Sequence, residues 1–493
     1  MGAGVEREHF QHLDYDRFGE RLERGLEALR SLLARPGFGA GQTTVGAELE
    51  LFLVDPAGRP LPLNDAVSAD TRDGRVTVEV DRFDLEVNLT PALMAGRPFS
   101  AFGRELDEVL RVVGRAAAAY GGRLAMIGIL PTLHPDDLGR GALSDRSRYR
   151  AIDRGLRRLR HEPFRVRIDG QDPLQTVCDG ISLEGANSSW QVHLRVDPAA
   201  FGRTYNAVQL ATPPVLAAAG NSPTFLGHRL WDETRIVLFK QAVDVRDEAA
   251  HGLRVARVAF GTDWVGDGAI EQFEQSVRLH QPVLPMLADE DPLDQVLDGR
   301  VPRLAELRLH QGTVWRWNRA IYDPAGGGHL RIELRSLPSG PTVTDMLANA
   351  AFAFGLSLAL APQARAWTRT LPFAQVHRDF YRAAKHGLDA RIAWQLDPGW
   401  PRTYPAAELI PLLLPRAHDG LVGAGVAPGE ARDLLEVVRE RVASRQTGAV
   451  WQRRVLARLV PELGRERALA AMLDRYVELS AAGSPVHTWP VDG

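Results

Sequence analysis

The sequence has a single cysteine, Cys178, and only two lysines, Lys240 and Lys385, among its 59 basic residues. One cysteine cannot form an internal disulfide, which suits a reducing compartment such as the cytoplasm. Nucleotide enzymes of the P-loop class require a lysine in the pattern G-x-x-x-x-G-K-[ST], and neither lysine stands in such a loop. A Schiff-base enzyme would have to use one of the same two residues. The sequence therefore excludes the P-loop class and leaves little room for lysine chemistry.

Long apolar runs and an excess of one charge are also missing. The N-terminal stretch "MGAGVEREHFQHLDYDRFGE" is charged throughout and has no apolar core of the kind a signal peptide needs. The most apolar run, "AAFAFGLSLALAP" at 350–362, is too short to span a bilayer and predicts a buried helix. The net charge of −3, with both signs interspersed, gives no basic stripe for nucleic acid or an anionic membrane. We therefore expect small-molecule partners and leave homo-oligomerisation open.

Hydrophobic periodicity predicts an α+β protein. Helices are expected at 7–34 and 99–120, and two more within 204–240, separated by the breaker "NSP". Alternating or short apolar runs predict strands at 45–55, 76–91, 121–133, 185–198 and 330–336. From about residue 344 onward the pattern is almost wholly helical, with breaks at "DPGWPRTYP" and "GAGVAPGE". Because helices do not alternate regularly with strands, we expect an antiparallel sheet flanked by helices.

Four of the expected strands combine an apolar back with a polar face. Side chains two residues apart on a strand share a face. One such strand is typical of a solvent-exposed face, and His193 alone would be typical of a hydrogen-bonded core histidine. Four together favour a site, because carboxylates and an imidazole suit Mg²⁺ or Mn²⁺ and arginines suit phosphoryl oxygens. The polar faces comprise Glu48 and Glu50; Glu79 and Glu86; Ser189, Gln191, His193 and Arg195; and Arg331, Glu333 and Arg335.

Five motifs occur in an order and spacing that resemble a known family. They are "GAELELF", "EVDRFDLEVNLTP", "SSWQVHLRV", "NSPTFLGHRLWDETR" and "LRIELRSLPSGPT". Together they resemble the glutamate–cysteine ligase family of carboxylate–amine ligases, in its bacterial second type, from about residue 42 to 395. The resemblance implies a glutamine-synthetase-like fold whose open antiparallel sheet binds ATP and Mg²⁺ or Mn²⁺. It also implies activation of a carboxylate as an acyl phosphate, followed by attack of an amine to give a γ-glutamyl-type amide.

The resemblance divides the chain into three parts. Residues 1–41 would be an N-terminal helix and linker, 42–395 the catalytic domain, and 396–493 a helical C-terminal extension outside the resemblance. The extension could serve as a dimer surface, a docking site or packing.

The resemblance also assigns residues. The matching metal positions are Glu48, Glu50, Glu79, Glu86, His193 and Glu333. Glu79 and Glu86 match less closely. The family usually has three positions from this glutamate to the Thr-Pro pair, whereas "EVNLTP" has four, an extra residue that a β-bulge could absorb. Arg235 in "WDETR" and Arg335 in "IELR" match arginines expected to hold phosphate or developing charge.

Further positions are expected on the substrate or ATP side. Arg148 and Tyr149 match a substrate-side arginine–tyrosine pair, although a surface helix explains them nearly as well. Asn221 would open a helix whose free N–H groups face an anion, with an ordinary helix cap as the alternative. The remaining candidates are Gln191 and Arg331, which share the polar strand faces, and Lys385 as a phosphate ligand.

Two questions stay open at the level of sequence. Trp315, Trp317 and Arg319 could wall a pocket for a larger substrate, or could simply pack against the sheet. The activity itself has alternatives: a phosphotransferase of the guanidino-kinase type on the same sheet, or a catalytically silent binding protein. Intact Glu48, His193 and Glu333 argue against the silent protein, because a decayed site usually loses its acids first.

Overall fold

The computed structural model describes residues 7–160, 162–246, 254–266, 268–396 and 399–492. Within them, an eight-stranded antiparallel sheet has the order β11-β12-β8-β1-β3-β2, with β4 and β5 also pairing with β1. This confirms the expected α+β class with a central antiparallel sheet. The strands of the sheet are β1 Thr44–Val54, β2 Val76–Val78, β3 Asp84–Asn88, β4 Ala92–Leu93, β5 Arg123–Ala125, β8 Trp190–Val196, β11 Asn318–Asp323 and β12 His329–Leu334.

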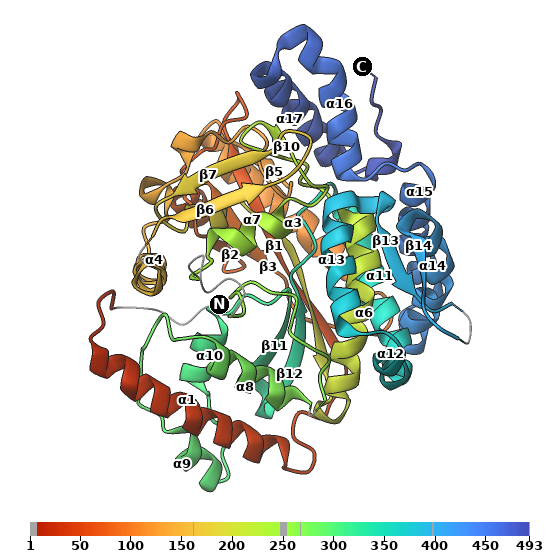
Figure 1. The fold of residues 1–493 in the computed structure, drawn as a ribbon. Coiled ribbons are helices and arrows are strands. Elements are labelled where there is room, and N and C mark those ends of the chain that lie inside the picture. Colours follow the sequence, from red (N-terminus) through yellow and green to blue (C-terminus); the bar gives the residue numbers. More distant parts are fainter. Residues whose placement is uncertain (1–6, 161, 247–253, 267, 397–398, 493) are drawn as a thin grey trace.

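The sheet has one apolar and one polar side, as the alternating sequence patterns require. Trp190, Val192 and Leu194 of β8 are buried on the apolar side. Helices cover that side: α6 (Phe201–Ala219) contacts β11 and β12, α11 (Val343–Leu360) contacts β8, and α3 (Pro98–Ala119) contacts β4 and β5. Figure 1 shows α6, α11 and α13 (Phe373–His386) lying side by side next to the sheet. The polar faces of the central strands are thereby left to build a site.

The apolar run near residue 350 lies inside this helical layer. Val343–Thr370 is long and apolar enough to cross a membrane, with 28 residues and a hydropathy of 1.5, but 78% of its most apolar window is buried inside the fold. The segment comprises α11, a short 3-10 turn and α12 (Ala364–Thr370). The expected buried helix is therefore confirmed.

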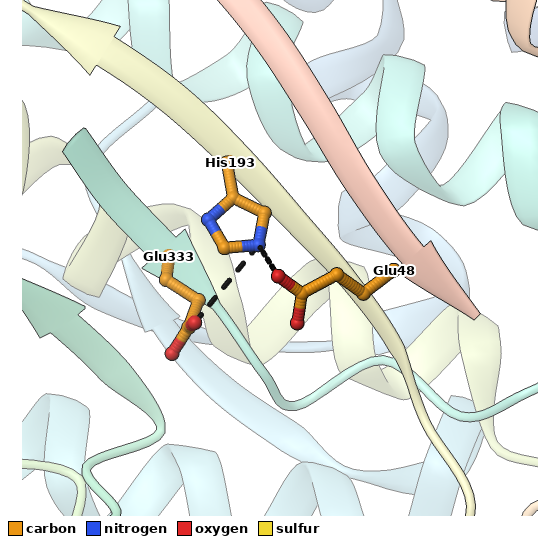
Figure 2. Close-up of side chains that lie close together, drawn as sticks. All are labelled: Glu48, His193 and Glu333. Carbon is orange, nitrogen blue, oxygen red and sulfur yellow. Dashed lines mark ion pairs between the residues drawn. The ribbon is translucent and has the colours of Figure 1, made fainter. Parts of the chain in front are cut away.

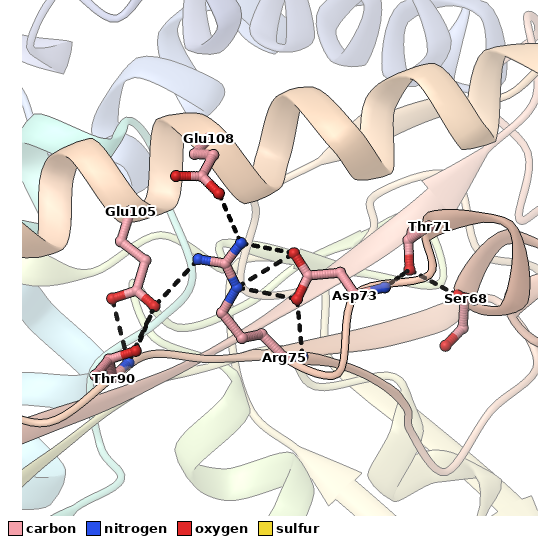
Figure 3. A network of polar contacts seen from close by, with 7 residues as sticks. All are labelled: Ser68, Thr71, Asp73, Arg75, Thr90, Glu105 and Glu108. Atoms are coloured by element: carbon pink, nitrogen blue, oxygen red, sulfur yellow. Dashed lines mark hydrogen bonds and ion pairs between the residues drawn. The ribbon is translucent and has the colours of Figure 1, made fainter.

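A network of polar contacts fixes the hairpin formed by β2 and β3 against α3 (Figure 3). The guanidinium of Arg75 donates to Asp73 (Nε to Oδ1, 2.9 Å) and to Glu108 of α3 (Nη2 to Oε1, 2.9 Å). Glu105 of α3 accepts from the hydroxyl of Thr90 at 2.9 Å. The hairpin carries Glu86, so the network helps to set the position of a candidate ligand.

Three hairpins and several helices lie outside the main sheet. The hairpins are β6 Phe164–Ile168 with β7 Leu174–Cys178, β9 Thr224–Phe225 with β10 His228–Arg229, and β13 Arg391–Trp394 with β14 Arg402–Pro405. The helices not yet bounded are α1 His12–Leu33, α2 Asn64–Thr71, α4 Ser147–Leu159, α5 Ser182–Gly185, α7 Arg235–Ala242, α8 Ala269–Leu279, α9 Pro292–Leu297 and α10 Ala305–Gln311. In Figure 1, α1 lies with α8, α9 and α10, which it contacts.

The C-terminal region is helical, as expected. It consists of α14 Ala406–Gly423, α15 Pro428–Ala443, α16 Gly448–Leu463 and α17 Arg465–Ala482. Helices α14 and α15 pack against α11. Arg441 of α15 forms a buried ion pair with Asp345 of α11, with 2.7 Å between Nη2 and Oδ1. The boundary at residue 395 stays a prediction, although these helices share their packing with the sheet-bearing part of the chain.

Three expectations about local structure were wrong. The strand expected over 121–133 is β5 alone, and the chain after Ala125 continues without regular structure. The breaker at Asn221 is followed by the β9–β10 hairpin rather than directly by a helix. In the region expected to be almost wholly helical, β13 is an unexpected strand, whereas its partner β14 lies in the expected break "DPGWPRTYP". In the last two cases a short hairpin outside the main sheet replaced what local periodicity indicated.

Candidate active site

The polar side of the sheet brings together residues from four neighbouring strands, β1, β8, β12 and β11. Glu333 on β12 lies directly opposite His193 on β8, and Arg319 on β11 lies directly opposite Glu333. On the other side of β8, His193 faces Gly46 of β1, which has no side chain to fill the space. Glu48, two residues further along β1, can therefore extend diagonally towards the imidazole.

Glu48, His193 and Glu333 form the centre of the site (Figure 2). The His193 Nε2 atom lies 3.2 Å from Oε1 of Glu48 and 3.9 Å from Oε1 of Glu333. One ligand atom from each residue falls within 4.8 Å of the other two. Both ring nitrogens of His193 are buried and lack a hydrogen-bond partner among the described residues. An imidazole between two carboxylates suits a divalent cation, so this trio, which separate strands contribute, fits the predicted metal site.

Two arginines compensate the charge of Glu333. Arg319 binds it with two parallel hydrogen bonds, from Nε to Oε2 at 2.8 Å and from Nη2 to Oε1 at 3.0 Å. Arg335 Nη1 adds a third at 3.2 Å to Oε2. Burial alone would raise the pKa of Glu333, but the positive charges of Arg319 and Arg335 outweigh it and hold the pKa well below its usual value. Glu333 is therefore ionised at neutral pH.

Glu50 and Glu86 extend the site along β1 and β3. The two residues lie directly opposite each other, and the register runs without a bulge from Asp84 to Asn88. The extra residue of "EVNLTP" falls after β3. Asn88 lies opposite Glu48 and Ala92 opposite Val45, so four steps along this segment face three steps of β1, which is the one-residue offset that a bulge produces. Glu50 accepts hydrogen bonds from the Ser189 amide at 2.7 Å and from Gln191 Nε2 at 2.6 Å. Burial, followed by the charges of Glu48 and Glu50, raises the pKa of Glu86 to about 7.

Further carboxylates crowd the end of the site next to Glu79. Burial and the nearby charge of Glu86 raise the pKa of Glu79 well above its usual value. Burial and the charge of Glu50 raise the pKa of Glu184 to about 8. Both carboxylate oxygens of Asp81 are buried without a hydrogen-bond partner in the part of the chain that the structure describes. Such crowding is unfavourable without positive charge, and it fits a site that holds more than one cation.

The two expected arginines lie next to each other but act differently. Arg335 follows β12 and donates to Gln191 as well as to Glu333, so its guanidinium lies on the polar side of the sheet. Arg235 opens α7, and its guanidinium donates to the backbone carbonyls of Ser336 at 3.2 Å and Arg335 at 3.3 Å. Arg235 thereby holds the backbone from which Arg335 extends.

Comparison with known proteins identifies the class to which this site belongs. The sequence profile of glutamate-cysteine ligase family 2 matches residues 44–474. The chain belongs to this family. It is accordingly an ATP-dependent ligase that forms a carbon–nitrogen bond. The match continues beyond residue 395, the expected end of the resemblance, and includes most of the C-terminal helices. A search of curated proteins finds no match.

A solved structure shows the same fold. The glutamate–cysteine ligase of Francisella tularensis, in complex with AMP, is 11% identical over 92% of this chain and 90% of that chain, with a TM-score of 0.54. A bifunctional glutathione synthetase from Pasteurella multocida is 12% identical over 95% of this chain and 55% of that chain, with a TM-score of 0.48. The glutamine-synthetase-like fold expected from the sequence is thus confirmed.

Of the two expected substrate-side residues on α4, Tyr149 lies beside the carboxylates. Tyr149 of α4 donates from its hydroxyl to the carbonyl of Val78 at 3.1 Å. Burial, followed by the charges of Glu79 and Glu86, raises the pKa of Tyr149 well above its usual value. Arg148 is half-buried and lies near Gly312 at the end of α10. Both residues remain candidates for substrate binding.

Three other expected residues have different surroundings. Asn221 is fully buried, and its Nδ2 donates to the Ser339 carbonyl at 2.7 Å, so it does not offer a helix N-terminus to an anion. Lys385 forms an ion pair with Asp169, away from the central trio. Arg331 shares the polar side of β12 but pairs with Asp323 at 3.3 Å. The anion-binding role expected of Asn221 was wrong, because the chain there turns into a hairpin.

The tryptophans near β11 belong to the core of the ligase. Trp317 is 1% exposed, and its ring lies 5.8 Å from that of Phe239 and 6.0 Å from that of Phe380. Trp315 packs on the same Phe239 at 6.0 Å. Packing was therefore the correct alternative for both rings. Arg319, the third residue of that group, instead belongs to the active site through Glu333.

The sequence did not reveal three contributors to the site. The local sequence does not indicate that Arg319 binds Glu333, because only the register of β11 on β12 brings the two residues together. Glu184 is on the four-residue helix α5, which no periodicity announces. Glu233 is fully buried and holds Arg235 Nη1 at 3.0 Å. Its place two residues before Arg235 in "WDETR" was the available clue.

Proposed function

We propose that the chain joins the carboxylate of an amino acid, glutamate by default, to an amine through an acyl-phosphate intermediate. A carboxylate oxygen attacks the γ-phosphorus of ATP, and ADP leaves. The amine nitrogen then attacks the activated carbonyl carbon, inorganic phosphate leaves, and the nitrogen releases a proton. The main support is that Glu48, His193 and Glu333 converge on one point, with Arg335 bound to the same Glu333.

The central trio supports the use of a divalent cation with ATP. Glu48, His193 and Glu333 would hold Mg²⁺ or Mn²⁺, and Glu50, Glu79 and Glu86 would hold further ions. Cations held there would neutralise the charge of the ATP phosphates. The crowded carboxylates support this assignment, since they are unfavourable without positive charge. The His193 imidazole, which lies close to Glu48 and Glu333, supports it too.

The arginines support phosphoryl transfer. The guanidinium of Arg335 lies beside the central trio and stays charged, because the charges of Glu333 and Glu50 outweigh burial and raise its pKa. There it would bind the phosphoryl oxygens as negative charge grows on them during transfer. Arg235 would fix the backbone of Arg335 rather than contact the phosphate. Gln191, Arg148, Tyr149 and Arg331 are the candidates for holding the substrates, and Lys385 is the weakest.

The most specific part of the proposal is the identity of the two substrates. The family supports glutamate as the carboxylate, whereas the acceptor amine need not be cysteine. We also place the enzyme in the cytoplasm, which the single buried Cys178 supports.

The proposal is tested by supplying the full-length protein with ATP, Mg²⁺ and amino acids, singly and in pairs with amines, while measuring ADP release. Mass spectrometry identifies the products. We expect ADP release to require one carboxylate and one amine together, and to yield their amide. Glu333→Gln serves as the control for contaminating ATPases. A stable phosphorylated product formed from a single substrate would replace the ligase with a guanidino-kinase-type phosphotransferase. No ADP above the control level with any pair would overturn the proposal.

A further inference from the structure

The C-terminal helix α17 reaches the active-site region through one hydroxyl group. Tyr476 is fully buried, and its OH donates to the carbonyl of Met126 at 2.7 Å. The same oxygen accepts from Asn221 Nδ2 at 2.8 Å. The ring is held between Trp451 of α16 and Trp489, whose ring centres lie 5.9 and 5.2 Å away. The position of the hydroxyl is therefore fixed by packing on both sides of the ring.

Asn221 is the meeting point of these contacts. Its side chain donates to the Ser339 carbonyl at 2.7 Å, and its Oδ1 accepts from Gln452 Nε2 of α16 at 2.9 Å. The first residue of α16, Gly448, lies so close that a Cβ atom there would overlap Asn221 Oδ1. The side chain of Asn221 is thus clamped by both C-terminal helices and by the loop that follows Arg335.

From Asn221 the contacts continue to the proposed catalytic arginine. The backbone N–H of Asn221 donates to Glu233 Oε2 at 2.8 Å, and Glu233 Oε1 accepts from Arg235 Nη1 at 3.0 Å. Arg235 in turn holds the carbonyls of Arg335 and Ser336. The segment 335–339 is therefore held at one end by Arg235 and at the other by Asn221.

We propose that Tyr476, Gln452 and Asn221 are positioning residues for Arg335, which makes the C-terminal helices part of the catalytic machinery. This inference rests on the proposed function of Arg335. Apolar side chains could fill the same buried volume, but they would not fix directions as a connected set of hydrogen bonds does. A misplacement of about 1 Å in a catalytic group can cost as much as 10²-fold in rate. The chain of contacts thus matters most for turnover.

The first test compares Tyr476→Phe with Tyr322→Phe, both in the full-length protein. Tyr322 is also buried and also donates its hydroxyl to a backbone carbonyl, that of Pro302 at 2.6 Å, but it has no contact with this chain of hydrogen bonds. Both variants keep the ring and lose one hydroxyl, so a similar fall in melting temperature is expected. We expect Tyr476→Phe to lower kcat about tenfold with the KM for ATP within about twofold, and Tyr322→Phe to leave both unchanged.

The second test asks whether Tyr476 acts through Arg235. Arg235→Lys and Tyr476→Phe are combined, and kcat is measured for the two single variants and the double variant. If the two residues act through the same series of hydrogen bonds, the kcat of the double variant is about as low as that of Arg235→Lys alone. A double variant whose fold-loss in kcat equals the product of the two single losses would overturn the inference. A normal kcat in Tyr476→Phe with a lowered melting temperature would overturn it as well. A parent enzyme with no ligase activity would instead refute the proposed function.

Discussion

Arg319 and Glu333 form a bidentate ion pair between β11 and β12, with N–O distances of 2.8 and 3.0 Å. The pair uses both oxygens of a carboxylate that is also proposed to bind a metal ion. Glu333 is 2% exposed, so its charge depends on Arg319 and Arg335 for compensation. A divalent cation would share that task, and the energetics of the pair should therefore depend on metal.

The first prediction concerns Arg319→Gln. Removing one partner of a buried pair leaves an uncompensated charge, so the variant should lose about 3 kcal/mol of unfolding free energy without metal. Mg²⁺ or Mn²⁺ should restore most of this loss, because the cation takes over the compensation. The measurement is urea unfolding with and without metal. A loss of the same size at saturating metal would show that Glu333 does not bind the ion.

The second prediction concerns Glu86→Gln. The pKa of Glu86 is raised from 4.5 to about 7, so the folded state binds more protons between these values and loses stability as pH rises through them. The amide removes this dependence and should stabilise the metal-free protein at pH 8 by about 1 to 3 kcal/mol, with little effect at pH 4.5. Adding Mg²⁺ should favour the parent instead. Parallel melting-temperature curves from pH 4.5 to 8 would contradict the prediction.

The third prediction concerns Arg335→Lys. The substitution keeps the charge but loses the planar fork that binds Gln191 and Glu333. We expect kcat to fall roughly 10²-fold or more, on the scale of losing one preorganised donor, while the KM for ATP moves much less. Steady-state kinetics with the substrates identified by the amine screen provide the measurement. A kcat within about threefold of the parent, about 0.65 kcal/mol of barrier, would remove Arg335 from catalysis.

The fourth prediction concerns acid stability and lies away from the active site. Burial, with a smaller effect of Arg257, lowers the pKa of His310 from 6.5 to about 4, and its Nε2 contacts the Ser276 carbonyl at 2.9 Å. The unfolded chain therefore binds the extra proton first, and stability falls as pH drops from 6.5 towards 4. His310→Gln keeps an amide donor and cannot titrate. Between pH 7 and pH 5 it should lose about 2 kcal/mol less than the parent in urea unfolding. Equal losses would show that His310 is already accommodated as a cation.

The polar faces were predictable from sequence because strand geometry alone sets them. Glu48, His193 and Glu333 were assigned to one face of their strands by a period of two, and the structure brings their side chains together. Neither the order of the strands nor their register was available from that period. The motifs supplied the missing information by resemblance, which is why the trio was predicted as a group.

The contacts that depend on long-range register could not be predicted. Arg319 meets Glu333 only because β11 pairs with β12 residue by residue. Asn221 was expected at a helix start because "NSP" is a common helix-opening pattern, yet Tyr476 and Gln452, more than 200 positions away, determine its surroundings. Tertiary contacts of this kind override local sequence preference, and no local pattern encodes them.

The acyl-phosphate route is tested most directly by following an oxygen atom. The amino-acid substrate is labelled with ¹⁸O in its reacting carboxylate and incubated with the full-length protein, ATP, Mg²⁺ and the acceptor amine. Because the carboxylate oxygen that attacks phosphorus departs with the phosphate, we expect one ¹⁸O atom in inorganic phosphate for each amide formed. Amide formation accompanied by unlabelled phosphate would contradict the account.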